Sequence, residues 1–360
     1  MCKKLIVFDI AIPRFRNNKV FDAEFARQFP GASVLPRLKE VAAGSGWDMM
    51  TGDVFLRNRP KFQRAVCLSN EATPELRDIL NRGVAPSVLT SGESPNVAWS
   101  FYHNLLRLSK EFRHVCLFKG VSSSVHQSTK FHIYHWPMPN VIPTVDIAFA
   151  DRRLLTMVSS FKERFGFNRQ KLASRIIAPL RWTRILYYQS INSHARFPDL
   201  YKMRIDAVLN FADRDEFFLF GYDWEVAQRY VKEIHNLAFA NTPSTCDNKI
   251  DTLSSFRFTL VFENCIFPGY VTEKIFDAML AGSIPIYLGA PDIGDFVPPQ
   301  CFIDFRKYDG FDALWKDISS WTDARWSESR DNIKNFLRSE QYTPFKEETV
   351  ATNIFMWLTN

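Results

Sequence analysis

Short apolar runs and helical patterns alternate along the first half of the chain. Apolar runs with strand character are separated by stretches in which apolar residues recur at helical spacing, as Ala72, Leu76 and Leu80 do. Strands are expected at 4–12, 63–68, 88–90 and 114–118, and helices at 33–44 and 71–82. This alternation is typical of a Rossmann-like unit built on a parallel sheet.

The same alternation continues after a proline-containing stretch at 136–150, which is interpreted as a linker. Strands are expected at 154–158, 217–220, 258–262, 284–288 and 301–303, and helices around 203–212, 224–236, 272–281 and 311–320. The pattern predicts the α/β fold class with two Rossmann-like domains, 1–150 and 151–340. An amphipathic segment at 347–358 predicts that residues 341–360 form a helix that packs back on the first domain.

The most informative stretch is 261–289, VFENCIFPGYVTEKIFDAMLAGSIPIYLG. A strand ends at Glu263 and Asn264, a loop follows, and a helix is expected to open at Thr272. Free backbone N–H groups at a helix start favour an anion, and Lys274 adds a positive charge there. Glu273 would repel a phosphate and is better suited to sugar hydroxyls. These residues therefore fit a nucleotide sugar, although an ordinary capped helix with a solvated Lys-Glu pair remains the alternative.

The block FENC-x5-YVTEK followed by IPIYLGAP resembles the signature of the α1,3-fucosyltransferases of glycosyltransferase family 10, in their soluble bacterial form. Further segments resemble the family in the same order, among them SGESPN at 91–96, LLTMVSSFK at 154–162 and FGYDW at 220–224. The resemblance implies the GT-B fold, with two Rossmann-like domains facing each other across a cleft. It also implies an inverting transfer of L-fucose from GDP-β-L-fucose to a hydroxyl.

The resemblance assigns the catalytic base to Glu93, in the first, acceptor-side domain; a carboxyl that only caps a turn is the alternative. It places the GDP-sugar site in the second domain, where Lys274 and Arg204 would hold the diphosphate. Arg196 is the fallback for Arg204, because the chain is longer than its relatives before that point. Glu273 would bind fucose hydroxyls.

Four further residues complete the predicted donor site. Asn264 and Tyr270 match family positions that line it, and Lys162 is a candidate phosphate contact. Glu263 has either a donor-binding or a structural role.

No cofactor or metal is expected. Asp213 and Asp215 have the D-x-D spacing but precede an expected strand, so a turn is the better interpretation. His132 and His135 would point to opposite faces of a strand. The six cysteines form no C-x-x-C pair, which favours isolated thiols, with a bridge between Cys246 and Cys301 left open.

Composition adds limits on location and partners. No run of 18 apolar residues exists, and Asp9 interrupts a signal-like start, so we expect a cytoplasmic protein. A net charge of +6 is too diffuse to indicate nucleic acid. The basic stretch from Lys162 to Arg184 is either a solvated helical hairpin or a surface for peripheral contact with the inner face of a membrane.

The expected partners are GDP-fucose and an oligosaccharide, glycolipid or lipopolysaccharide-type acceptor, modified at O3 of GlcNAc or Glc. Two alternatives stay open at this stage. One is a transferase of the same fold with another GDP-sugar donor. The other is a carbohydrate-binding relative without activity, against which the joint presence of Glu93, Glu273 and Lys274 argues.

Overall fold

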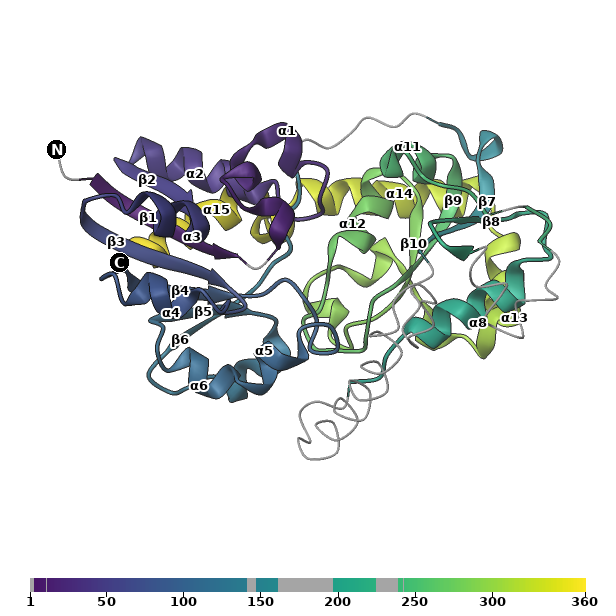
Figure 1. Ribbon diagram of the computed structural model, residues 1–360. Helices are drawn as coiled ribbons and strands as arrows, with labels where there is room; N and C mark the ends of the chain where they lie inside the picture. The colour runs from purple at the N-terminus through teal and green to yellow at the C-terminus, as the bar shows by residue number, and fades with distance from the viewer. Residues whose placement is uncertain (1–2, 11, 141–146, 161–196, 225–238, 242) are drawn as a thin grey trace. The chain divides into compact units, whose positions relative to one another are not determined.

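The computed structural model describes residues 3–10, 12–140, 147–160, 197–224, 239–241 and 243–360 (Figure 1). The chain divides into two compact units. Unit 1 comprises Met1–Val141, Pro268–Glu273 and Glu340–Asn360, and unit 2 comprises Ile142–Phe267 and Lys274–Ser339. Among the described residues, no helix combines the length and the apolar character needed to cross a bilayer.

Unit 1 is built on a sheet whose strands lie in the order β2-β1-β3-β4-β5-β6, each pair parallel. The strands are β1 (Lys3–Ile10), β2 (Trp47–Thr51), β3 (Phe62–Asn70), β4 (Ala85–Thr90), β5 (His114–Leu117) and β6 (Lys130–Ile133). The helices are α1 (Ala23–Ala26), α2 (Val34–Gly44), α3 (Gly52–Asn58), α4 (Leu76–Leu80), α5 (Trp99–His103), α6 (Leu105–Ser109) and α15 (Glu347–Thr359). The 3-10 helices are η1 (Pro13–Phe15), η2 (Lys19–Phe21), η3 (Lys119–Ser124) and η9 (Glu340–Phe345).

Helix α15 lies beside α2 and contributes to the core of unit 1 (Figure 1). It buries Val350, Ala351, Ile354 and Leu358 among apolar side chains of α2 and the central strands. The spacing of three to four residues puts these side chains on one face of the helix, which explains the amphipathic pattern of the sequence. Residues far apart in the chain thus share one core.

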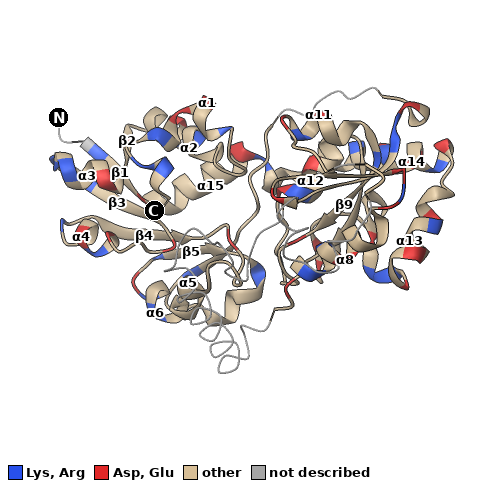
Figure 2. Cartoon of the chain, turned by 45° about the vertical axis from the view of Figure 1, so that its right-hand side comes forward, with Lys and Arg blue, Asp and Glu red and all other residues tan. Residues whose placement is uncertain are grey.

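Unit 2 has a second parallel sheet, in the order β11-β10-β9-β7-β8. The strands are β7 (Arg153–Val158), β8 (Phe217–Phe220), β9 (Phe256–Phe262), β10 (Ile284–Leu288) and β11 (Ile303–Asp304). The helices are α8 (Tyr201–Phe211), α11 (Lys249–Ser254), α12 (Glu273–Leu280), α13 (Gly310–Ser319) and α14 (Asp323–Arg338). The 3-10 helices are η4 (Phe149–Asp151), η6 (Ile293–Asp295), η7 (Pro299–Cys301) and η8 (Phe305–Lys307). Both signs of charge occur on α4, α8 and α13, as Figure 2 shows.

The predicted fold class is confirmed, since both units are α/β with parallel sheets. Several local expectations were wrong. The helix expected at 71–82 is reduced to α4, because Glu71 and Ala72 adopt left-handed backbone angles ahead of Pro74. The last strand covers Ile303–Asp304, since Cys301 belongs to η7. Elements without a clear apolar period were not predicted at all: β2, β6, α1, α3, α5, α6, α11 and α14.

The division between the units lies at Val141/Ile142 and not at 150/151. Packing explains the difference, because Phe149 lies 5.6 Å from the ring of Trp326, between ring centroids. The carbonyl of Phe149 also accepts a hydrogen bond from Arg257 Nε at 2.9 Å. The described cysteines, Cys67, Cys116, Cys246, Cys265 and Cys301, are all free thiols, so Cys246 and Cys301 are not bridged.

Candidate functional site

The carboxyl edge of the sheet in unit 2 carries a buried ion pair. Glu263 directly follows β9, its side chain is fully buried, and its backbone N–H donates to Leu288 O at 2.8 Å. Lys274, in the first turn of α12, donates from Nζ to Glu263 Oε2 at 3.0 Å and keeps a quarter of its side chain exposed. The carboxylate is therefore a partner of the lysine and is itself shielded from solvent.

Gly289 makes room for this pair. A Cβ at that position would lie 2.5 Å from Glu263 Cγ and 2.5 Å from Tyr287 Oη, closer than real contacts allow. Tyr287 is buried, and burial together with the negative charge of Glu263 holds the pKa of its phenol well above the usual value. Its Oη accepts a hydrogen bond from Ala290 N at 2.9 Å. The small residue after β10 thus lets the glutamate and the tyrosine pack side by side.

Arg204 joins the end of β9 from helix α8. Its Nη2 donates to Phe262 O at 2.7 Å and to Asn264 Oδ1 at 3.0 Å, and its side chain is largely buried. Leu200 N also donates to Asn264 O at 3.1 Å, which ties the start of α8 to the same turn. Arg204, Asn264, Glu263 and Lys274 are therefore gathered at the end of one strand.

That edge lies at a topological switch point. Strand β7 lies between β8 and β9. The connection from β7 to β8 runs to one side of β7, and the connection from β8 to β9 runs to the other side, so the strand order reverses there. In open α/β sheets the crevice for a ligand forms beyond the carboxyl ends of such a pair of strands. The Glu263–Lys274 pair follows one of these two strands.

The loop from Pro268 to Glu273 belongs to unit 1. Pro268 O accepts from Gly120 N at 3.0 Å, and a Cβ on Gly269 would lie 2.8 Å from Lys119 Cβ. Tyr270 is buried, with its ring edge-on to Phe118 at a centroid distance of 4.9 Å. The predicted donor-site residue Tyr270 thus packs against apolar side chains of unit 1, and the chain continues from it into α12.

Glu93 stands in the loop after β4, also in unit 1, with an exposed side chain. Its backbone N–H donates to Ser91 Oγ at 3.1 Å, and its carbonyl accepts from Tyr102 Oη at 2.8 Å. Tyr134 is half-buried, and the pKa of its phenol is raised first by desolvation and then by nearby Cys116, Glu273 and Glu93. Within unit 1, the two glutamates therefore act on the same phenol.

Lys162, the fallback Arg196 and the basic stretch up to Arg184 lie outside the described residues. Asp213 and Asp215 lie in two consecutive turns before β8, closed by hydrogen bonds from Arg214 N to Phe211 O and from Phe217 N to Arg214 O. Sequence reasoning missed Ser91, Glu71, Tyr134 and Gly289. Ser91 and Gly289 stand in the SGES and YLG strings, but the residues beside them, Glu71 and Glu263, come from other parts of the chain.

Comparison with known proteins gives sequence matches to part of the chain. The profile described as glycosyltransferase family 10 (fucosyltransferase) C-term matches residues 227–325. An α-(1,4)-fucosyltransferase of Arabidopsis thaliana is 45% identical over 62 residues, 17% of this chain and 16% of that protein. The α-(1,3)-fucosyltransferase FucT of Helicobacter pylori is 43% identical over 65 residues, 18% of this chain and 14% of that protein. The matched part therefore spans about a sixth of the length of these relatives.

Solved structures extend the likeness in fold to the whole chain. A crystal structure of an α1,3-fucosyltransferase covers 100% of this chain and 91% of its own, with 14% identity and a TM-score of 0.51. Anabaena HepE, solved with UDP-glucose, covers 99% of each chain with 10% identity and a TM-score of 0.56. The fold is thus that of the GT-B glycosyltransferases. Residues 227–325 match the model of the glycosyltransferase family 10 (fucosyltransferase) C-terminal part, in agreement with the resemblance inferred from the sequence.

Proposed function

We propose that this protein is an inverting α1,3-fucosyltransferase that moves L-fucose from GDP-β-L-fucose to O3 of GlcNAc or Glc in an oligosaccharide or glycolipid. The observation that carries the proposal is the Glu263–Lys274 pair, which stands after β9 inside the family 10 domain. A buried carboxylate fixes the ammonium group at the carboxyl edge of the sheet. An anionic donor is the ligand that such a preorganised cation favours.

The reaction is a single displacement. The acceptor oxygen attacks the anomeric carbon while its proton passes to the carboxylate of Glu93, acting as general base. The bond from the anomeric carbon to the phosphate oxygen breaks, and its electron pair leaves with GDP. Lys274 and Arg204 stabilise the negative charge that grows on the diphosphate. One displacement converts a β-linked donor into an α-linked product.

The remaining donor residues take supporting roles in this proposal. Glu273 accepts hydrogen bonds from fucose hydroxyls, and Asn264 orients Arg204, whose Nη2 lies 3.0 Å from its Oδ1. Glu263 positions Lys274 from beneath, since its side chain is fully buried. Tyr270, whose ring packs edge-on against Phe118, is assigned to the lining of the donor site. No metal or other cofactor takes part.

Fold alone does not select the nucleotide, because HepE shares it and was solved with UDP-glucose. The test is calorimetric titration with GDP-fucose, GDP-mannose, UDP-galactose and UDP-glucose, followed by transfer to N-acetyllactosamine. We expect GDP-fucose to bind most tightly and fucose to be transferred. Preference for GDP-mannose would replace the donor while keeping the roles of Lys274 and Arg204. Absence of nucleotide binding would favour a carbohydrate-binding relative.

We also propose a cytoplasmic enzyme with a lipopolysaccharide-type acceptor, in peripheral contact with the inner face of a membrane. Cosedimentation with vesicles containing anionic lipids, for the whole chain and for a variant lacking 162–184, tests the membrane contact. Equal behaviour of the two proteins would remove that stretch from the proposal.

A further inference from the structure

A series of hydrogen bonds leads away from the backbone of Glu93. Glu93 N donates to Ser91 Oγ at 3.1 Å, and Ser91 Oγ donates to Glu71 Oε1 at 2.7 Å. Ser91 is fully buried, so its hydroxyl keeps these two hydrogen bonds rather than exchanging them with water. The carboxyl of Glu71 thus determines where the hydroxyl points, and the hydroxyl determines where the amide of Glu93 lies.

Glu71 stands in a strained turn. Its φ is 67°, and that of Ala72 is 52°, so two consecutive non-glycine residues adopt left-handed angles. Such a backbone conformation is strained and persists only where its surroundings hold it, most often at functional sites. Here Glu71 N donates to Thr90 O at 3.0 Å and Ala72 N donates to Ser69 Oγ at 3.2 Å. The turn is therefore tied to both β4 and β3.

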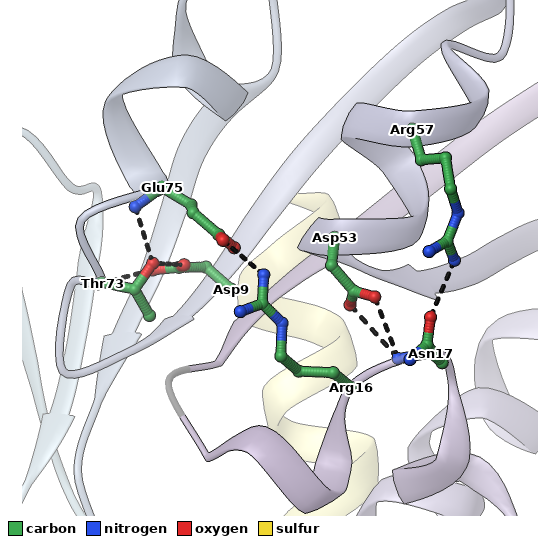
Figure 3. A network of polar contacts seen from close by, with 7 residues as sticks. All are labelled: Asp9, Arg16, Asn17, Asp53, Arg57, Thr73 and Glu75. Atoms are coloured by element: carbon green, nitrogen blue, oxygen red, sulfur yellow. Dashed lines mark hydrogen bonds and ion pairs between the residues drawn. The ribbon is translucent and has the colours of Figure 1, made fainter.

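A buried carboxylate anchors the other end of the turn. Asp9, near the end of β1, accepts from Ser69 Oγ at 2.6 Å and from Thr73 N at 3.1 Å, and also from the Thr73 hydroxyl. Figure 3 shows the contact between Asp9 and Thr73, together with Glu75, which pairs with Arg16. Burial raises the pKa of Asp9 and that of Glu71 above the usual values. Asp9, Ser69 and Ser91 are buried, whereas Glu71 is half-buried.

The network occupies the switch point of its own sheet. Strand β1 lies between β2 and β3, which follow it in the chain on opposite sides, so the strand order reverses at β1. Asp9 and Ser69 stand near the carboxyl ends of β1 and β3. Ligands of open α/β sheets bind beyond such ends. A strained, buried network at this edge orients the loop that carries the exposed carboxylate of Glu93.

We propose that Glu71 and Ser91 are positioning residues for the reaction, holding the backbone of Glu93 so that its carboxylate meets the acceptor hydroxyl. The inference rests on the proposed role of Glu93 as the base. Tyr102 secures the carbonyl of Glu93 from the other side. With both ends of the residue held, the carboxylate searches a small volume, and displacement by about 1 Å would cost on the order of 100-fold in rate.

The test is a mutant cycle on fucose transfer with saturating donor. Ser91→Ala and Glu71→Ala are each expected to lower kcat about 10- to 100-fold, with the KM for GDP-fucose unchanged. Glu71→Gln should retain most of the rate, because its amide oxygen still accepts from Ser91 and the substitute is neutral. Ser87→Ala is the matched control: it removes a hydroxyl from β4 that is equally buried and has no hydrogen-bond partner among the described residues.

The cycle distinguishes positioning from a merely structural role. In a Glu93→Gln background, Ser91→Ala should cause no further loss of the residual rate, because there is no base left to position. Equal losses in both backgrounds, or a wild-type kcat for Ser91→Ala, would overturn this inference alone. A fully active Glu93→Gln enzyme would overturn the base assignment and the inference with it. If Ser91→Ala fails to fold, Glu71→Ala against Glu71→Gln decides the same question.

Discussion

Replacing Lys274 by methionine should destabilise unit 2 strongly. The substitution keeps the length of the side chain but leaves the carboxylate of Glu263 without its ammonium partner. Glu263 is fully buried, so water cannot replace the lost contact. Burying a charge without its partner is among the costliest single changes a protein can suffer.

The size of the effect follows from the geometry. At 3.0 Å and an effective dielectric constant of about 20, Coulomb's law gives about 5–6 kcal/mol for the pair. Removing one partner of a buried pair costs about 3–5 kcal/mol. Because a quarter of the Lys274 side chain is exposed, we take the lower end, about 3 kcal/mol. For a domain of this size, that lowers Tm by about 6–12 °C.

Thermal denaturation of Lys274→Met, compared with Lys334→Met, provides the assay. Lys334 lies 3.0 Å from Asp331, the same distance, but the two side chains are 49% and 69% exposed. The control should therefore change the stability by about 0.5 kcal/mol or less. The variant pair separates burial from distance, because the substitution and the N–O distance are the same.

A double variant, Glu263→Gln with Lys274→Met, should recover at least half of the lost stability, since no charge is left unpaired. GDP-fucose affinity should stay low in both variants, because the ammonium group is absent from both. Equal Tm values for Lys274→Met and wild type would refute the reasoning. Failure of the double variant to recover would show that packing rather than charge is decisive.

Three further outcomes are expected. Gly289→Ala should cost about 1–3 kcal/mol in urea denaturation, because its Cβ would lie 2.5 Å from Glu263 Cγ; Gly294→Ala, whose Cβ meets nothing within 4 Å, is the control, and equal stabilities would contradict the geometry. Burial lowers the pKa of His132, beside His114, from 6.5 to about 4, so the unfolded chain takes up a proton that the folded chain does not. Stability should therefore fall as the pH falls from about 6.5 to about 4, and an unchanged pH dependence in His132→Gln would argue against this. Fucose transfer should be unaffected by excess EDTA; strict dependence on manganese would contradict the metal-independent scheme.

The sequence predicted best the short strands that are apolar at every position. Strands β8 and β10 have the expected bounds, 217–220 and 284–288, because a short, uninterrupted apolar run leaves few alternatives. Helix α14 was not predicted, because only a few of its residues, such as Trp326 and Ile333, are buried and the rest of its surface is polar. Its period is too sparse to stand out.

The helix expected at 71–82 shows the opposite error. Ala72, Leu76 and Leu80 recur at a spacing of four, which imitates one face of a helix. The structure uses Glu71 and Ala72 in a strained turn instead, and α4 begins at Leu76. Local spacing cannot reveal this, because the turn is held by hydrogen bonds to β3 and β4.

The candidate site was predicted only in its residue types. The grouping of Arg204, Asn264, Glu263 and Lys274 agrees with the motif, but the complete burial of Glu263 follows from its packing against Gly289 and Tyr287. Which of two adjacent glutamates faces a ligand is a property of packing across strands. A single sequence does not show how closely Glu263 approaches Gly289 and Tyr287 on the neighbouring strand.

The position of α15 has a consequence for biosynthesis. The core of unit 1 joins side chains from Ile6 to Cys116 with Val350 to Leu358. More than 200 residues are translated between these two groups, which takes roughly 10–50 s at 5–20 residues per second. During that interval the nascent unit 1 keeps an apolar face open, whereas the residues of unit 2 are already complete. We therefore expect the second unit to finish folding first on the ribosome, and the first unit to depend on chaperones until its last helix emerges.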